Sequence, residues 1–203
     1  MNACDLEYYG KYADMLMSSC DALLDGINSV LDGLTQDPEY ALAEHVRIRI
    51  KSSQSLRGKL IKQGFDEDAR TGLTVLSDII GARIVAHFIG DVYEILECIK
   101  QSGLWEIINI KDYISNPKTN GYRSLHVILR LPSGSPDFEF IMAEIQIRTI
   151  AMDCWASLEH QMRYKKNIKN IDLISDELKR CADEMASTDL SMQTIREMIR
   201  PDN

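Results

Sequence analysis

The sequence has no paired cysteines and no long apolar run. Its five cysteines are scattered over 203 residues and never form Cys-x-x-Cys, the kind of spacing that structural zinc sites use. No stretch approaches the roughly 20 apolar residues that a membrane-spanning helix needs. The first residues, Met-Asn-Ala-Cys-Asp-Leu-Glu, lack the basic and apolar regions of a signal peptide. We therefore expect reduced thiols, a cytoplasmic location and no membrane partner.

An excess of positive charge is also missing. The chain has 23 basic and 31 acidic side chains and a net charge of −8, which argues against a nucleic-acid partner because phosphate contacts supply most of the affinity in such complexes. Hydrophobic residues make up 45% of the chain and charged residues 27%, which is typical of a globular protein with a sizeable core. The length predicts a single domain over residues 1–203.

The spacing of apolar residues predicts a mixed α/β sheet with flanking helices. Residues 45–51 alternate between apolar and basic side chains, as in a half-buried strand. Further strands are predicted at residues 79–88, 105–111, 124–131 and 138–148. Helices are predicted at residues 5–34, 38–44, 52–63, 91–101, 150–164 and 173–200. The predicted fold has about five strands in a core over residues 40–165, with helical extensions over 1–38 and 170–203.

The basic side chains are concentrated in one segment. Residues 45–65 contain six basic side chains and no acidic one, whereas the rest of the chain contains 17 basic and 31 acidic side chains. The cations and one hydroxyl fall on one face of the predicted strand and one face of the following helix: Arg47, Arg49, Lys51, Ser55, Lys59 and Lys62. Such a pattern fits either a solvated basic face or a trough for a nucleotide polyphosphate.

Two carboxylates accompany the predicted strands. Asp78 precedes the strand at 79–88, and Glu144 shares one face of its strand with Gln146 and Arg148. Carboxylates from two strands could hold Mg²⁺, which prefers oxygen ligands and accepts substrate phosphates as the rest of its shell. An Asp at the entrance to a strand, such as Asp78, is more often a simple turn residue, so the residues alone leave both interpretations open.

A loop between two predicted strands contains several potential binding residues. Residues 111–126 include the turn signals Asn-Pro and Asn-Gly. A turn does not explain why Lys118, Tyr122, Arg123 and His126 gather there. Loops on a rigid sheet are where binding residues concentrate, and a tyrosine ring offers a face on which a base can stack.

Five motifs in order resemble the RelA/SpoT-type (p)ppGpp synthetase domain, and most closely its single-domain form, the small alarmone synthetases. The motifs are Arg49-x-Lys51-x-x-x-Ser55-x-x-x-Lys59, Asp78-Ile-x-Gly-x-Arg83, Asp112-Tyr-Ile-x-Asn-Pro-Lys118-x-Asn-Gly-Tyr122-Arg-Ser-x-His126, Glu144-Ile-Gln-Ile-Arg-Thr149 and Trp155-Ala-x-x-Glu-His160. They cover about residues 40–165. The chain has no His-Asp dipeptide, so the hydrolase region of longer family members is not expected.

The resemblance implies a GTP pyrophosphokinase, which transfers the β,γ-pyrophosphate of ATP to the ribose 3′-hydroxyl of GDP or GTP and releases AMP. The residues that would bind ATP are Arg49, Lys51, Ser55, Lys59, Lys62 and Arg83. Asp78 and Glu144 would be catalytic and hold Mg²⁺, with Glu144 also placed to take the 3′-hydroxyl proton. The residues that would contact the acceptor guanine nucleotide are Lys118, Tyr122, His126, Gln146 and Asp153.

The resemblance also leaves alternatives open. Asp153 stands where small synthetases often have Asn beside the acceptor base; an ionised Asp only accepts hydrogen bonds, which could still suit the N1–H and 2-amino group of guanine. A separate alternative keeps the ATP site and changes the acceptor to an adenosine nucleotide or the 3′ end of tRNA. A catalytically silent nucleotide-binding regulator is a third interpretation. Small members of the family form tetramers through terminal helices, so we expect a homotetramer. Residues 44–48 lack the Phe-x-Thr-Gly pattern that accompanies an allosteric pppGpp cleft, so that regulation is not expected.

Overall fold

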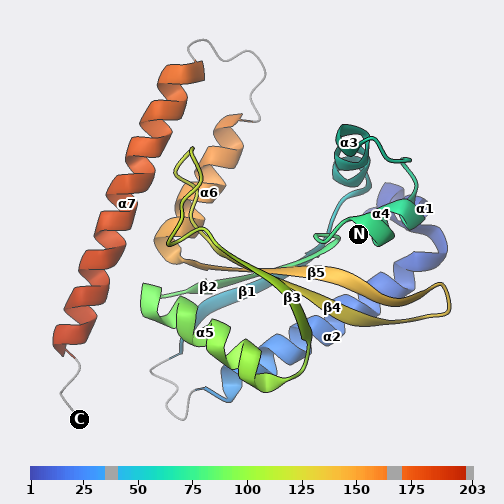
Figure 1. Cartoon of the computed structure of the whole chain (residues 1–203), viewed down its shortest axis with the longest axis horizontal. Helices are drawn as coiled ribbons and strands as arrows, with labels where there is room; N and C mark the ends of the chain where they lie inside the picture. The colour runs from blue at the N-terminus through green and yellow to red at the C-terminus, as the bar shows by residue number, and fades with distance from the viewer. Residues whose placement is uncertain (35–40, 164–170, 200–203) are drawn as a thin grey trace.

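The computed structural model describes residues 1–34, 41–163 and 171–199 (Figure 1). Helix α1 (Ala3–Tyr9), a 3-10 turn η1 (Gly10–Tyr12) and helix α2 (Ala13–Asp32) come first. The central elements are β1 (Ala43–Ile50), α3 (Ser53–Gln63), α4 (Ala69–Val75), β2 (Ile80–Ala86), α5 (Ile89–Ser102), β3 (Glu106–Asp112), β4 (Leu125–Ser135) and β5 (Phe138–Thr149). Helices α6 (Ile150–Arg163) and α7 (Ile171–Ile199) follow.

One mixed five-stranded sheet organises these elements. The strand order is β1-β2-β5-β4-β3. Strands β2 and β5 run parallel, and the other neighbouring strands run antiparallel. A parallel pair needs a crossover connection, which α5, β3 and β4 provide here. The predicted mixed α/β sheet is therefore confirmed.

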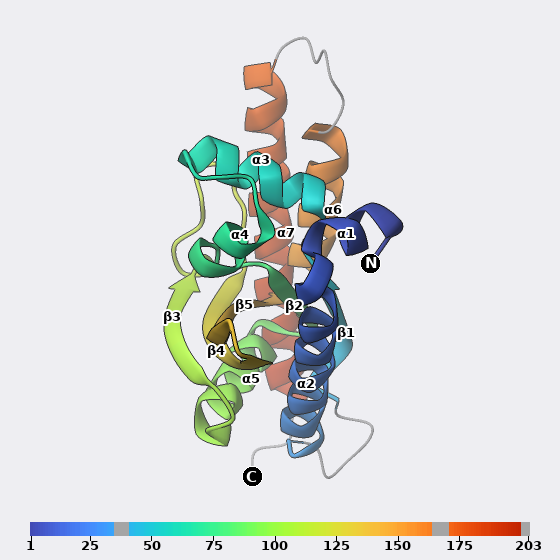
Figure 2. The same ribbon diagram turned by 90° about the vertical axis from the view of Figure 1, so that its right-hand side faces the viewer.

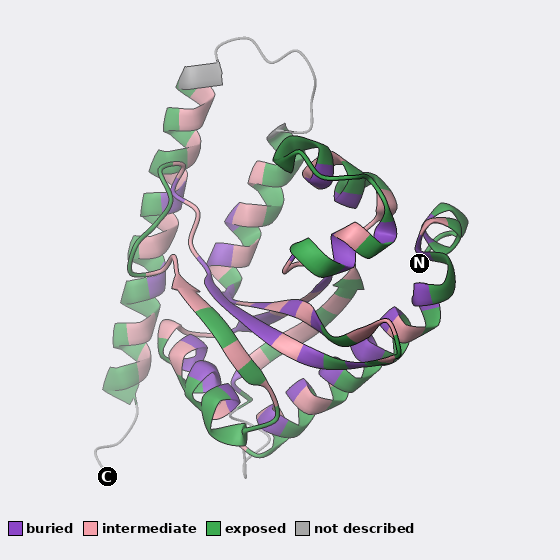
Figure 3. Cartoon of the chain, turned by 45° about the vertical axis from the view of Figure 1, so that its right-hand side comes forward, coloured by how far each residue is buried: buried purple, intermediate pink, exposed green. Residues whose placement is uncertain are grey.

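The sheet has a core face and a polar face. Figure 1 shows α2 and α5 below the sheet, and α3 and α6 above its two ends. Figure 3 shows buried residues along the strands and in stripes on α2 and α5. The following side chains, among others, form this core: Leu16, Leu23, Ile27, Ile84, Ile95, Ile99, Val127, Ile145 and Ile147. Because strand residues alternate between faces, burying these side chains turns their polar neighbours toward α3 and α6.

Helix α3 has clear local start and stop signals. Ser52 caps its first turn and accepts a hydrogen bond from the Ser55 amide at 3.3 Å. Gly64 adopts a left-handed conformation, with φ of +77°, and ends the helix. The helix therefore begins directly after β1, as the sequence predicts.

The predicted helix over residues 38–44 is wrong at its C-terminal end. Ala43 and Glu44 belong to β1, and Ala43 pairs with Ala86 of β2, so pairing with a distant strand overrides the local preference. Residues 38–40 lie outside the described residues. Helix α4 was not predicted, and the expected helix over 5–34 is interrupted at Gly10, whose φ is +51°.

Two further expectations concern the cysteine thiols and membrane-spanning helices. All five cysteines are free. In the described ranges, no helix combines the length and the apolar character that crossing a membrane requires.

Candidate active site

A cavity of about 230 Å³ lies on the polar face of the sheet. Its lining residues are Arg47, Ile48, Arg49, Asp78, Gly81, Ala82, Arg83, Glu144 and Gln146. Five of them, Arg49, Asp78, Arg83, Glu144 and Gln146, are predicted site residues. The structure therefore brings the basic strand and both carboxylates to one cavity.

The strand register explains how this cavity forms. Residues directly opposite one another on paired strands point to the same face. The register across β1, β2 and β5 makes one row of Arg47, Arg83 and Gln146 and a second row of Arg49, Gly81 and Glu144. Gly81 has no side chain to fill the space between Arg49 and Glu144. The floor of the cavity is therefore open between a guanidinium and a carboxylate.

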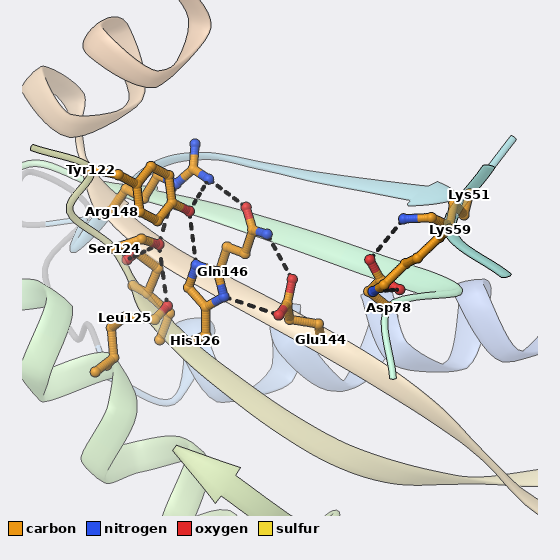
Figure 4. A network of polar contacts seen from close by, with 11 residues as sticks. Lys51, Lys59, Asp78, Tyr122, Ser124, Leu125, His126, Glu144, Gln146 and Arg148 are labelled. Carbon is orange, nitrogen blue, oxygen red and sulfur yellow. Dashed lines mark hydrogen bonds and ion pairs between the residues drawn. The ribbon is translucent and has the colours of Figure 1, made fainter. Parts of the chain in front are cut away.

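Three charged residues at one end of the site form a lysine cluster: Lys51, Lys59 and Asp78. Lys51 Nζ donates to Asp78 Oδ2 at 2.7 Å, and Lys59 Nζ donates to Asp78 Oδ1 at 2.9 Å (Figure 4). Burial alone would raise the pKa of Asp78. The hydrogen bonds and charges of the two lysines outweigh burial and lower this pKa below its usual value. The cluster thus holds an ionised carboxylate and carries a net positive charge.

The other end of the site is an arginine network, which consists of Tyr122, Ser124, His126, Glu144, Gln146, Arg148 and Asp153. Arg148 lies at its centre, and its side chain is 5% exposed. Its guanidinium donates to Tyr122 Oη at 2.6 Å, to Gln146 Oε1 at 2.5 Å and to Ser124 Oγ at 3.3 Å. Figure 4 shows these side chains from β4, β5 and the preceding loop converging on one another. A buried arginine satisfied in this way holds its partners in fixed orientations.

Two hydrogen-bond paths lead from Arg148 to Glu144. Along the first, Tyr122 Oη lies 2.8 Å from His126 Nε2, and His126 Nδ1 lies 3.0 Å from Glu144 Oε1. Tyr122 Oη accepts a hydrogen bond from Arg148 and has its own proton with which to donate to His126 Nε2. The ionised Glu144 can only accept, so His126 donates to it from Nδ1. Along the second, Gln146 Nε2 donates to Glu144 Oε2 at 2.7 Å. Each oxygen of Glu144 is thereby oriented.

Glu144 remains ionised in this arrangement. Burial alone would raise its pKa, but the hydrogen bonds from His126 and Gln146 lower the pKa below its usual value. The negative charge of Asp78 acts against them. In Figure 4, the Glu144 carboxylate lies at the end of the arginine network that is nearest to Asp78. Glu144 is therefore where the two ends of the site meet.

Asp153 links the arginine network to the cavity. Arg83 Nη1 and Arg148 Nη1 lie 3.1 Å and 3.2 Å from Asp153 Oδ1. Burial and repulsion by the charge of Arg148 lower the pKa of Arg83. Asp153, from the first turn of α6, thus holds two neighbouring guanidinium groups together.

The β3–β4 loop, residues 113–124, contributes Tyr122 to this network and places Lys118 against the Tyr122 ring. Lys118 Nζ lies 4.5 Å and 4.7 Å from the ring centroids of Tyr113 and Tyr122. The loop is closed by backbone bonds from Lys118 N to Tyr122 O and from Gly121 N to Lys118 O, at 3.2 Å and 2.8 Å. The predicted binding loop therefore holds a cation and an aromatic ring in direct contact.

Asp78 and Glu144 fit Mg²⁺ by the chemistry of their oxygens. Both carboxylates line the same cavity, and each oxygen keeps lone pairs beyond the one bond described above. Over residues 1–34, 41–163 and 171–199, no group of three or more His, Cys, Asp or Glu side chains could hold a metal ion. A cation here would therefore rely on substrate oxygens for much of its shell, as Mg²⁺ commonly does.

Not every predicted residue lies at the cavity, and two residues were missed. Ser55 and Lys62 are exposed on α3, and Ser55 Oγ accepts a hydrogen bond from Ser52 Oγ at 2.9 Å. Arg47 lines the cavity, in keeping with its place on the predicted basic strand face, but it was assigned no substrate contact. Arg148 forms the centre of the network and was likewise assigned no role. The signal that could have identified them is alternation along a strand: Arg47 shares a face of β1 with Arg49, and Arg148 shares a face of β5 with Gln146.

Comparisons with known proteins give consistent results. A family model described as "Region found in RelA / SpoT proteins" matches residues 48–169. The GTP pyrophosphokinase YwaC of Bacillus subtilis is 41% identical over 157 residues, which cover 77% of this chain and 75% of that protein. The GTP pyrophosphokinase YjbM of the same organism is 28% identical over 174 residues, which cover 85% of this chain and 80% of that protein.

Solved structures also resemble this chain. Small alarmone synthetase 2 from Bacillus subtilis has a TM-score of 0.80 at 36% identity, with 94% of this chain and 99% of that chain covered. Small alarmone synthetase 1 from Bacillus subtilis, bound to its product pppGpp, has a TM-score of 0.80 at 26% identity, with 91% and 94% covered. The likeness extends beyond residues 48–169 into the terminal helices.

Proposed function

Because the chain belongs to the RelA/SpoT family, we propose that it is a GTP pyrophosphokinase of the small alarmone synthetase type. It transfers the β,γ-pyrophosphate of ATP to the 3′-hydroxyl of GDP or GTP, forms ppGpp or pppGpp, and releases AMP. The observation that carries the proposal is the single cavity shared by Arg49, Arg83, Asp78 and Glu144. Pyrophosphate transfer depends mainly on positioning and charge neutralisation, and this cavity offers both.

In this proposal the lysine cluster and the basic strand bind ATP. Lys51 and Lys59 pair with Asp78, and in the proposal their ammonium groups also bind the phosphate oxygens of ATP. Arg49 and Arg83 present planar guanidinium groups, which suit both phosphate binding and stacking on adenine. Ser55 and Lys62 remain proposed ATP contacts on the exposed face of α3, where a bound triphosphate extending from the cavity would have to reach them.

The arginine network and the β3–β4 loop bind the acceptor nucleotide. Tyr122 stacks on guanine, and Lys118, His126 and Gln146 contact the nucleotide. Asp153, when ionised, only accepts hydrogen bonds. It therefore favours guanine, whose N1–H and 2-amino group donate, over adenine, whose N1 accepts.

Glu144 performs the proton transfer. Its pKa is held low by His126 and Gln146, so it is ionised at neutral pH and able to accept the 3′-hydroxyl proton. A Mg²⁺ ion held by Asp78 and Glu144 would neutralise charge on the transferring phosphates. The donor set of this cavity supports that cofactor.

The proposed enzyme works as a homotetramer in the cytoplasm, where its nucleotide substrates are. The proposal treats residues 1–203 as one synthetase domain with helical extensions. Exposed apolar side chains on α7 support self-association: Leu173, Leu190, Met192, Ile195, Met198 and Ile199. Sedimentation or light scattering of the purified chain would measure the oligomeric state.

A product assay tests the proposed reaction. The chain is incubated with Mg²⁺, γ-labelled ATP and one acceptor at a time, namely GDP, GTP, ADP or bulk tRNA, and products are separated by thin-layer chromatography. We expect labelled ppGpp and pppGpp together with AMP. Labelling of ADP or tRNA in preference to the guanine nucleotides would overturn the acceptor assignment, and no transfer to any acceptor would overturn the activity.

A further inference from the structure

Helix α1 holds the junction between β1 and α3. The buried Asp5 carboxylate accepts hydrogen bonds from the amide and the hydroxyl of Ser53, both at 2.7 Å. Tyr9, which is 1% exposed, donates its hydroxyl to the Lys51 carbonyl oxygen at 2.6 Å. Figure 2 shows α1 close to α3. Asp5 also places a negative charge at the N-terminus of α3, where the helix dipole favours it.

This junction supports the lysine cluster. Lys51 is the residue whose carbonyl Tyr9 binds, and its amide donates to the Ile79 carbonyl at 2.8 Å. Two residues later α3 begins, and this helix carries Lys59. Because Lys51 belongs to the junction and Lys59 lies less than two helical turns beyond Ser53, a shift of the junction changes the positions of both lysines relative to Asp78.

Helix α7 holds the β3–β4 loop through Arg123. The guanidinium of Arg123 donates to the Ala182 carbonyl oxygen at 3.2 Å and to Asp183 Oδ1 at 3.0 Å. It also donates to the carbonyl of Gly121 at 3.1 Å. The residues on both sides of Tyr122 are thereby tied to α7.

The loop and α7 approach each other too closely for any side chain at Gly121. This residue has a φ of +87°, and a Cβ placed on it would lie 2.6 Å from Ala182 Cβ. Ala182 itself is 4% exposed. On the same helix the Leu178 carbonyl accepts a hydrogen bond from the indole N–H of Trp155 at 2.8 Å. The position of α7 along the loop is therefore defined by close packing and by bonds to its backbone.

We propose that the two terminal helices are separate positioning elements: α1 sets the affinity for ATP through the lysine cluster, and α7 sets the affinity for the acceptor nucleotide through the β3–β4 loop. Neither helix contributes a side chain to the cavity lining. Residues 3–9 and 171–199 also lie outside the segment that the family model matches. The inference rests on the proposed function, since it names the substrates of that site.

The test at α1 uses Asp5→Ala and Tyr9→Phe, which remove hydrogen bonds to the junction. We expect each to raise the KM for ATP by about three- to tenfold, the worth of one or two hydrogen bonds, with the KM for GDP within about twofold of wild type. Asp5→Asn keeps an accepting oxygen and should recover part of the loss. The matched control is Lys11→Ala, which removes an exposed ion pair with Asp137 and should change neither KM.

The test at α7 uses Asp183→Ala, because Asp183 is on the helix and outside the site. We expect a rise of about three- to tenfold in the KM for GDP and little change in the KM for ATP. A double-mutant cycle with Arg123→Ala separates a contact through α7 from a direct contact with substrate: coupled effects support the proposal, and additive effects oppose it. Arg180→Ala, which breaks exposed pairs on the same helix, is the matched control.

The decisive result is the opposite selectivity of the two sets of variants: changes on α1 should raise only the KM for ATP, and the change on α7 should raise only the KM for GDP. A merely structural role would change both KM values together, whatever the change in melting temperature, and that result would overturn the inference. A wild-type chain without pyrophosphate transfer would refute the proposed function instead. In that case the dissociation constants of ATP and GDP, measured by calorimetry on the same variants, provide the same comparison.

Discussion

The lysine cluster and the arginine network are built in different ways. In the lysine cluster the side chains of Lys51, Asp78 and Lys59 are 12%, 22% and 35% exposed, and all contacts are ion pairs. In the arginine network Arg148 and His126 are 5% and 8% exposed, and most contacts are directional hydrogen bonds. Electrostatic interactions are weaker and more adaptable near solvent, and stronger in a dry environment.

This difference between exposed ion pairs and buried hydrogen bonds indicates how each substrate would be bound. Ammonium groups on flexible stems can move from Asp78 toward phosphate oxygens, so the lysine cluster suits a polyphosphate whose charge changes during the reaction. The arginine network holds a ring, a carboxylate and an amide in place before any ligand arrives. Such preorganisation suits recognition of a base and orientation of a hydroxyl.

The largest expected effect is at Glu144, where the two clusters meet. Replacing the carboxylate by an amide of the same shape, Glu144→Gln, removes the base but keeps the cavity. We expect kcat to fall by about 10³-fold, because general-base catalysis contributes on that order, while the dissociation constant for ATP stays within about threefold. Single-turnover transfer and ATP calorimetry measure the two quantities. Turnover within about tenfold of wild type would remove Glu144 from this role.

The next effect compares the stability of the two clusters. Arg148→Met removes the buried donor that Tyr122, Gln146 and Asp153 share. Although each of them keeps one other partner, we expect a loss of about 3 kcal/mol in the free energy of unfolding. Lys59→Met removes a partly exposed ion pair and should cost less than about 1 kcal/mol. Urea denaturation of both variants gives the values, with Arg130→Met as a control on an exposed pair. Equal losses of unfolding free energy in Arg148→Met and Lys59→Met would contradict the proposed difference between the arginine network and the lysine cluster.

A smaller effect is expected from removing the Tyr122 ring, the proposed stacking surface in the arginine network. Tyr122→Ala removes the ring, and we expect the KM for GDP to rise by about tenfold, within the range of base–aromatic stacking. The KM for ATP should not change. Tyr122→Phe keeps the ring and loses only the hydroxyl that bonds Arg148 and His126. It is the matched control for stacking, and we expect it to change both KM values little. Steady-state kinetics with each substrate varied decides the matter, and an equal rise in both KM values would refute stacking.

The smallest effect concerns pH and two buried carboxyls on the terminal helices. The backbone and hydroxyl bonds from Ser53 lower the pKa of Asp5, whereas burial raises the pKa of Asp189 on α7 despite a bond from Thr149. The contribution of Asp5 is therefore present above its unfolded pKa and is lost as pH falls through the lowered pKa. Asp189 behaves oppositely, because stability decreases as pH rises through its raised pKa.

The two carboxyls accordingly predict opposite mutant effects at neutral pH. Asp5→Asn should lower the melting temperature and Asp189→Asn should raise it. As the pH falls from 7, the Asp189 difference should shrink first, while the pH passes through the raised pKa of Asp189. The Asp5 difference should persist to lower pH and shrink only below the ordinary carboxyl pKa, because the pKa of Asp5 is lowered. Thermal denaturation of both variants across this range provides the measurement. A shift of the same sign at pH 7 in both variants would contradict the assignments.

Strong local patterns made much of the fold predictable. The alternation over residues 45–51 and the apolar runs of the other strands predicted all five strands, and the ordered motifs predicted the RelA/SpoT family, which is confirmed. Ala43 and Glu44 show where this approach failed. Their helical pattern is weak, and pairing of Ala43 with Ala86 outweighs it.

The site was only partly predictable for a related reason. Arg148 alternates with Glu144 and Gln146 on one strand face, but nothing local shows that Tyr122, Ser124 and Asp153 gather around it. Each of those residues comes from another element, and each contact depends on the register of β4 with β5 and on the first turn of α6. The roles of Asp5 and Arg123 depend likewise on contacts across 48 and 59 residues.

Residue order alone was enough to reveal the strands, the basic segment and the family, because each of these is encoded in the spacing of neighbouring side chains. The meeting of Asp78 with two lysines, the central position of Arg148 and the attachment of each terminal helix to a different cluster required the folded chain. Those features are contacts between distant segments, and the packing and register of the whole sheet determine which of them form.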